Sequence, residues 1–302
     1  MSAAEERLPS YGGQAVIEGV LMRGTRFIAM AMRAPDGTIV MHEETLGGIY
    51  TSSWMKIPFL RGLVGLWDAL AIGIRFLTIS ANTQTGENEK LEGWPLFLTL
   101  GASLSIGIGL FFLAPAGVGQ MAESWLGWNA FASNILEGLL RLLLLIVYIW
   151  AIGYMPDIRR VFQYHGAEHK TINAFEAKAE LTPETVATYS LEHPRCGTSF
   201  LLTLVVISIL AFAFLGPLPT VWRLLSRVIL LPVLAAISYE YIRWAARHLH
   251  YRIVRWLIKP NLALQHLTTR TPDLGQLEVA IAAFKAMYTK EEAAKTVHPS
   301  TT

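Results

Sequence analysis

The chain has 302 residues, of which 53% are hydrophobic and only 16% are charged, and its mean hydropathy is +0.40. A soluble globular domain typically carries about 25% charged residues, so this composition indicates a membrane protein in contact with a lipid bilayer. The formal net charge of +2 is too small to indicate a nucleic-acid partner, and the single cysteine excludes an internal disulfide.

Residues 1–55 predict a small cytosolic β unit. The stretch FIAMAMRAPDGTIVMHEETL predicts two strands joined around Asp36 and Gly37, because Asp-Gly between apolar runs is a strong hairpin signal. The preceding AVIEGVLMRG is expected to supply a third strand. Tight bends or close backbone approach are indicated by four glycines, Gly12, Gly13, Gly19 and Gly24. A unit of this size is not stable alone, so we expect it to dock on the rest of the protein or on the membrane.

Residues 56–94 predict an interfacial helix followed by a polar linker over 82–94. Arg61, Asp68 and Arg75 recur every seven residues between 58 and 80, which gives an otherwise apolar helix one narrow polar stripe. This pattern favours a helix that lies in the interface or is covered by the bundle. A fifth membrane span is the alternative.

Four apolar stretches are long enough to cross the hydrocarbon core, which requires about 20 helical residues. They cover residues 95–119, 135–155, 198–215 and about 228–246. We therefore expect transmembrane helices 1 and 2 within 95–155 and helices 3 and 4 within 198–246. Glu137 and Arg141 lie four residues apart in the second stretch and could pair on one helix face.

The distribution of Lys and Arg predicts the orientation. The 156–197 connection carries five basic residues, whereas the 120–134 connection carries none, and basic loops stay on the cytoplasmic side. Arg223 and Arg227 depart from this pattern. We expect a mainly α, polytopic protein of the inner (cytoplasmic) membrane, with both termini, the 156–197 loop and an amphipathic helix and tail over 247–302 on the cytoplasmic side.

The 156–197 loop contains a candidate metal site. His165, Glu168 and His169 match the pattern H-x-x-E-H, in which residues i and i+4 share one helix face and both imidazoles can reach one cation. This is the inverted zincin arrangement, in which the glutamate polarises a metal-bound water. Glu168 is therefore the predicted catalytic base. His193 and Cys196 follow with the H-x-x-C spacing of a zinc knuckle.

The predicted ligands of a divalent cation, with zinc favoured, are His165, His169, His193 and Cys196. If all four bind, the site is closed and the metal is structural. If only three bind, water takes the fourth position and Glu168 acts as a general base. The alternative without metal is that these histidines make loop hydrogen bonds and that Cys196 is a buried thiol.

Three further carboxylates are accessory candidates. Glu176 lies seven residues after His169 on the same helix face and could be another ligand or a hydrogen-bond partner of a histidine. Glu18 could belong to the active centre or pair with Arg23. Glu240 lies in the inner half of the fourth span, where a carboxylate costs about 2.5–3.5 kcal/mol, so it should pair with Arg243 or point toward the metal loop.

Several blocks together resemble the YqhQ-like family of bacterial membrane proteins: GGQAVIEGVLMRG, YHGAEHKTINAFE, HPRCGTSF, SYE and QHLTTRTPDLGQLEVAIAA. This family is a domain of unknown function whose members are often labelled predicted metal-dependent enzymes. The resemblance covers about residues 11–284 and implies one shared site of His165, Glu168, His169, His193 and Cys196. It implies no substrate. Leu274 stands where a second acidic residue would be expected, which weakens a role for Asp273 as half of an acidic pair.

Three functions are compatible with these patterns. The first is a membrane-embedded metal-dependent hydrolase or peptidase that acts on a membrane-bound or lipid-linked substrate. The second is a non-catalytic, zinc-stabilised scaffold or assembly factor. The third is a transporter in which Glu240 and the polar stripe of residues 58–80 line a path, although the sequence has no visible inverted repeat.

Overall fold

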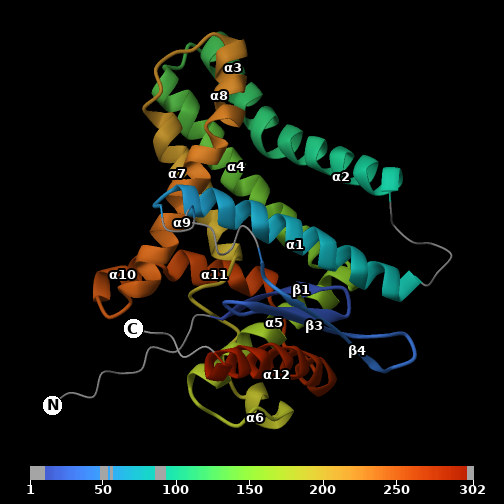
Figure 1. The fold of residues 1–302 in the computed structure, drawn as a ribbon. Coiled ribbons are helices and arrows are strands. Elements are labelled where there is room, and N and C mark those ends of the chain that lie inside the picture. Colours follow the sequence, from blue (N-terminus) through green and yellow to red (C-terminus); the bar gives the residue numbers. More distant parts are fainter. Residues whose placement is uncertain (1–10, 48–53, 55–56, 86–92, 298–302) are drawn as a thin grey trace.

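A computed structural model describes residues 11–47, 54, 57–85 and 93–297, and it shows a helical bundle standing above a small β-sheet with helices on both faces (Figure 1). The fold confirms the predicted class, a mainly helical membrane protein with an N-terminal β unit. The predicted 82–94 linker is partly wrong: residues 82–85 continue a helix and 93–94 begin the next, while 86–92 lie outside the described residues.

The sheet is an antiparallel meander in chain order, made of β1 (Gly12–Val16), β2 (Gly19–Arg23), β3 (Phe27–Arg33) and β4 (Ile39–Thr45). The hairpin predicted at Asp36 and Gly37 is confirmed, because Arg33 pairs with Ile39 and Gly37 takes a φ of +86°. Glycine adopts this left-handed conformation without the steric cost of a Cβ.

The stretch AVIEGVLMRG, expected to form one strand, contributes to two. The chain turns at Ile17 and Glu18, with Glu18 at a φ of +54°, and Val16 then pairs with Gly19. Gly19 lies so close to β3 that a Cβ there would be 2.4 Å from the Ala31 carbonyl oxygen. The glycine is thus required for the close strand contact that follows the turn.

The sheet is the middle layer of the part of the molecule that lies beside the helical bundle (Figure 1). One face packs on α5 (Pro156–Glu176) and α12 (Leu274–Val297), through Val20, Met22, Ala29 and Ala31. The other face packs on Phe76 of α1 (Leu60–Thr85), through Val16, Leu21, Ile28, Met30 and Met32. Because alternate residues of a strand point to opposite faces, burial of both faces makes β2 and β3 continuously apolar.

The membrane helices differ in length from the predicted spans. Within the described residues, three helical segments are long and apolar enough to cross a membrane: α1, the run from 93 to 126, and α4 (Ala130–Ile152). A fourth crossing could be made by α8 (Thr220–Ile229) and α9 (Leu231–Arg247), which are bent by 41°. The predicted third span is a shorter apolar helix, α7 (Thr198–Ala213). Pro232 lies in the first turn of α9, where its missing N–H costs nothing.

Helix α1 lies along the sheet with its polar stripe facing protein. Asp68 accepts from Arg23 of β2 at 2.5 Å, Arg75 pairs with Glu44 of β4, and Arg61 donates from Nε to Glu240 of α9 at 2.7 Å. The opposite side of α1 exposes large apolar side chains, among them Trp67, Leu70 and Leu77. The helix therefore has the two-sided character that the interfacial interpretation requires.

A buried ionic network ties the bundle together. Glu137 of α4 accepts from Arg141 at 2.7 Å, as the i,i+4 spacing predicted, and from Nε and Nη2 of Arg227 at 2.7 Å each. Arg223 pairs with Glu123 and donates to the Asn134 side chain. Arg223 and Arg227 departed from the orientation rule because they are buried partners of acidic side chains rather than loop charges.

The run from 93 to 126 is not uniform: α2 (Gly93–Ile108) passes through a π-helical turn, η4 (Gly109–Leu113), into α3 (Ala114–Leu126). A π turn disturbs the regular backbone ladder. Arg141 donates from Nε to the Phe111 carbonyl at 2.9 Å, so the network also satisfies a backbone acceptor of this turn. After α9 the chain continues through α10 (Arg252–Leu257) and α11 (Lys259–Thr268) to α12.

Candidate metal centre

Helix α5 carries the H-x-x-E-H residues into the protein interior. It begins at Pro156, whose fixed φ suits a first turn, with Asp157 beside the positive end of the helix dipole. The first half of the predicted 156–197 loop is thus this helix, which ends at Glu176, and a short helix α6 (Pro183–Ala187) follows. Gly166 allows a close contact, since a Cβ there would be 2.2 Å from the Arg270 carbonyl oxygen.

His165, His169 and Cys196 converge. One ligand atom from each lies within 4.8 Å of the others, and His165 Nε2 is 3.2 Å from Cys196 Sγ. His165 and His169 come from adjacent turns of α5, with ring centroids 4.4 Å apart. Cys196 comes from the segment that precedes α7, so the i,i+4 pair meets the later H-x-x-C block as expected.

Backbone carbonyls fix the tautomers of both histidines. Nδ1 of His165 lies 2.9 Å from the Thr268 carbonyl oxygen, and Nδ1 of His169 lies 2.5 Å from that of Leu191. A carbonyl oxygen only accepts, so each Nδ1 carries a proton, and in the neutral ring each Nε2 keeps its lone pair. This is the arrangement that orients metal-binding histidines in proteins.

The cluster fits a divalent cation. Nε2 of His169 is buried and has no hydrogen-bond partner among the described residues, and leaving a buried polar atom unpaired costs about 1–3 kcal/mol. A cation between the three side chains would give this lone pair a partner. Two imidazoles and a thiolate are a donor set that suits zinc.

His193, the fourth predicted ligand, lies beside this group but is not one of its three members. Its ring centroid is 5.8 Å from that of His169, and its Nε2 is 3.7 Å from Glu176. Burial lowers the pKa of His193, which favours the neutral ring, while the Glu168 carboxyl opposes this shift. Its ligand role stays a prediction. Glu176, an accessory candidate, also forms an ion pair with Arg195.

The backbone at His193 is held by a residue that the sequence analysis missed. The side chain of Gln265, in α11, accepts from the His193 N–H and donates to the His193 carbonyl, each at 2.9 Å. The same amide donates to Ser199 at 3.2 Å. A single glutamine in a helical stretch carries no spacing signal, so the sequence alone could not single it out.

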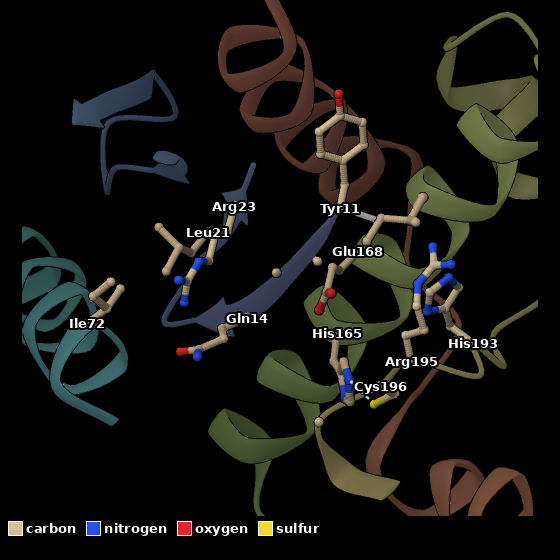
Figure 2. A pocket seen from close by; sticks show the side chains of 14 residues that line it. Tyr11, Gln14, Leu21, Arg23, Ile72, His165, Glu168, His193, Arg195 and Cys196 are labelled. Atoms are coloured by element: carbon tan, nitrogen blue, oxygen red, sulfur yellow. Dashed lines mark hydrogen bonds between the residues drawn. The ribbon is translucent and has the colours of Figure 1, made fainter. Parts of the chain in front are cut away.

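Glu168 lines a cavity of about 230 Å³, and His165, His193 and Cys196 line the same cavity (Figure 2). Burial raises the pKa of the Glu168 carboxyl, while His165, His193 and a hydrogen bond from the Gly13 backbone oppose the rise. A Cβ at Gly13 would lie 3.1 Å from Cγ and Cδ of Glu168 and 2.4 Å from the Leu21 carbonyl oxygen. Strand β1 thus closes over the carboxyl, which is the close approach that the glycines indicated.

Comparison with known proteins identifies the family. The family model described as "Protein of unknown function (DUF1385)" matches residues 57–290. The chain belongs to this family. It is also 34% identical over 299 residues to the "Uncharacterized protein YqhQ" of Bacillus subtilis (strain 168), covering 92% of each chain. The YqhQ-like resemblance is therefore confirmed, and no solved structure matches.

In this DUF1385 protein, two of the accessory carboxylates are paired away from the cluster. Glu18 pairs with Arg160 of α5 and accepts from the Tyr164 hydroxyl at 3.2 Å, rather than pairing with Arg23. The Arg160 guanidinium lowers the pKa of Glu18. Glu240 pairs with Arg61 instead of the expected Arg243. Neither carboxylate lines the cavity beside Glu168.

Proposed function

We propose that this protein is a metal-dependent hydrolase of the inner (cytoplasmic) membrane, with its site and both termini on the cytoplasmic side. His165, His169 and Cys196 would hold a divalent cation, with zinc favoured, and Glu168 would act as the general base. The observation that carries the proposal is the unpartnered Nε2 of His169 in a three-residue donor set, next to a cavity that Glu168 lines.

A bound divalent cation supplies Lewis acidity and lowers the pKa of a coordinated water to about 7. Glu168 accepts the proton of the attacking water and returns it to the leaving group. Its buried carboxyl has a raised pKa, and a general base works best when its pKa approaches the working pH. The Gly13 backbone and strand β1 orient the carboxyl and limit the access of bulk water.

The open side of the donor set favours a catalytic over a purely structural metal. A structural zinc site closes with four protein ligands, whereas a catalytic site keeps one position free. Three donors converge here, and a cavity adjoins them. A fourth bond from His193 would instead support the zinc-stabilised scaffold. Glu240, which the transporter hypothesis requires, is neutralised by Arg61.

Elemental analysis of the purified full-length protein tests this proposal together with three variants. We expect about one metal ion per chain in the parent and in Glu168→Gln, and loss of the metal in His165→Ala, because a mutated ligand weakens a three-donor site far more than a mutated base does. His193→Ala decides the coordination: retained metal supports the open site, and lost metal supports the closed one.

Function is measured by complementation of a strain that lacks the gene for this protein. Glu168→Gln should keep the metal and abolish function. A parent protein that binds no metal would overturn the proposal, as would full function of Glu168→Gln.

A further inference from the structure

Three hollows follow one another from the candidate site toward the exposed apolar face of α1. The site cavity beside Glu168 shares Arg195, Cys196 and Gly197 with a second hollow of about 540 Å³, here called the basic cavity. The basic cavity in turn shares Leu66 with a third hollow of about 450 Å³, here called the apolar groove. The three hollows are therefore neighbours with shared walls.

The apolar groove lies between α1 and α9 and is lined by apolar side chains, including Leu63, Leu66, Trp67, Leu70, Leu231 and Ala235. Trp67 is 72% exposed and Leu70 is 53% exposed. An exposed apolar surface of this kind on a membrane protein faces the hydrocarbon of the bilayer. A ligand that binds in the groove would therefore contact it with a hydrocarbon chain rather than with polar groups.

The basic cavity has the opposite chemistry. Arg195, Arg243 and Arg247 line it, and none of the described residues that line it is acidic. Among the described residues, neither Arg243 nor Arg247 forms a side-chain hydrogen bond or a close ion pair, and Arg243 interacts with Glu240 only at longer range. Arg195 pairs with Glu176, but its buried Nε has no hydrogen-bond partner in the same part of the chain.

Nearby carboxylates offset only part of this positive charge. Glu240, one helical turn before Arg243, forms its ion pair with Arg61 and interacts with Arg243 only at longer range. Glu176 offsets one guanidinium of the three. Arginine matches phosphate oxygens with its planar fork, and several arginines around one point favour an anion with more than two acceptor oxygens.

We propose that the substrate of this site is an anionic amphiphile. Its phosphate-bearing headgroup would lie between Arg195, Arg243 and Arg247, and its hydrocarbon chain would lie in the apolar groove between α1 and α9. The proposal rests on the proposed function for the reaction and adds the class of substrate. The molecule would enter from the bilayer through the apolar groove, so that its headgroup could reach Glu168 and Cys196 while its hydrocarbon chain stays in the membrane.

Photolabelling of the full-length protein tests this proposal. The protein is placed in phosphatidylcholine nanodiscs with a minor fraction of phosphatidic acid that carries a diazirine on its acyl chain, and labelled peptides are mapped by mass spectrometry. We expect labels concentrated on the α1 and α9 segments that line the groove. Arg243→Gln/Arg247→Gln should reduce this labelling about tenfold, because each arginine contributes charge-assisted hydrogen bonds to the headgroup.

The matched control is Arg252→Gln/Arg255→Gln, which removes two exposed arginines of α10 that line none of the three hollows. This variant should label like the parent. Unlabelled phosphatidic acid should compete, whereas phosphatidylcholine and water-soluble glycerol 3-phosphate should not. Competition by glycerol 3-phosphate would replace the lipid with a free phosphate ligand and overturn the proposal.

Other outcomes also overturn it. Labelling spread evenly over all lipid-facing helices would indicate only surrounding lipid. An unlabelled groove would indicate that a second copy or another segment covers it. Photolabelling needs neither metal nor turnover, so its result and the metal content of the same protein separate the two proposals. Localised labelling without bound metal defeats the hydrolase alone, and bound metal without localised labelling defeats the substrate class alone.

Discussion

Gly13 is the residue of β1 that lies against the side chain of the candidate base, Glu168. Its Cα faces the Glu168 side chain, and the nearest obstacle to a Cβ is the backbone oxygen of Leu21 at 2.4 Å, which cannot rotate away. Gly13→Ala should therefore lower stability by about 1–3 kcal/mol, the usual cost of overpacking. The metal content should not change, because no proposed ligand is touched. Gly12→Ala is the matched control, since a Cβ there would have no neighbour within 4 Å among the described residues. Thermal unfolding of both variants measures the difference, and equal midpoints would contradict the expectation.

The convergence of His165, His169 and Cys196 could be predicted from two short spacings in the sequence, the i,i+4 pair of histidines on one helix face and the H-x-x-C block that ends at Cys196. The groups that orient them could not: the carbonyls of Leu191 and Thr268 are backbone atoms, and any residue type supplies one. The predicted ion-pair partners of Glu18 and Glu240 were wrong for a related reason. Pairing each carboxylate with its nearest basic neighbour in the sequence suggested Arg23 and Arg243, whereas tertiary packing supplies Arg160 and Arg61.

Another prediction at this scale concerns pH. The hydrogen bond from Arg160 lowers the pKa of Glu18 below the ordinary value of a glutamate carboxyl, so the ionised carboxylate stabilises the folded state at neutral pH. The contribution is lost as the pH falls through the lower, folded-state pKa. Glu18→Gln should be less stable than the parent at pH 7, and the gap should close under acidic conditions. Thermal midpoints at several pH values measure the gap, and a constant gap would show that the pair contributes no charge-dependent stability.

At the scale of elements, hydropathy located the helices but not their ends or their breaks. The π turn at Gly109–Leu113 lies inside a uniformly apolar run and is satisfied by Arg141 from another helix. The β1–β2 turn was missed because Ile17 and Glu18 lack the Asn-Gly or Asp-Gly signal of a hairpin. Both features depend on contacts between segments far apart in the chain.

The ionic network gives the prediction for this scale. Glu137→Gln keeps the shape of the side chain but leaves Arg141 and Arg227 without their shared anion. Loss of one partner from a buried ion pair costs about 3–5 kcal/mol, so the variant should unfold at a clearly lower temperature. Glu44→Gln, which breaks the exposed pair with Arg75, should cost only about 0–1 kcal/mol. Similar losses in both variants would show that the network is not desolvated.

The topology of the whole molecule follows from which elements touch. The sheet precedes α1, yet it packs on both α5 and α12, so these three parts lie on one side of the membrane. If the 93–126 segment and α4 each cross once, the chain has already returned to that side at α5. A crossing by α1 would make the number odd and separate the sheet from α5. Because α5 and α12 lie on the same side, the number of crossings between them is even. If the bent pair α8–α9 crosses, α7 must also cross, although α7 has only 16 residues.

Single cysteines introduced into Cys196→Ser protein test this topology with a membrane-impermeant maleimide. Trp128→Cys, between α3 and α4, and Gly216→Cys, between α7 and α8, should react in intact cells. Thr85→Cys, at the end of α1, and Glu180→Cys, after α5, should react only after permeabilisation. Reaction of Thr85→Cys in intact cells would mean that α1 crosses the membrane. The sheet could then not cover Glu168, because the two would lie on opposite sides of the bilayer, and the closed arrangement of Gly13 over the carboxyl would be lost.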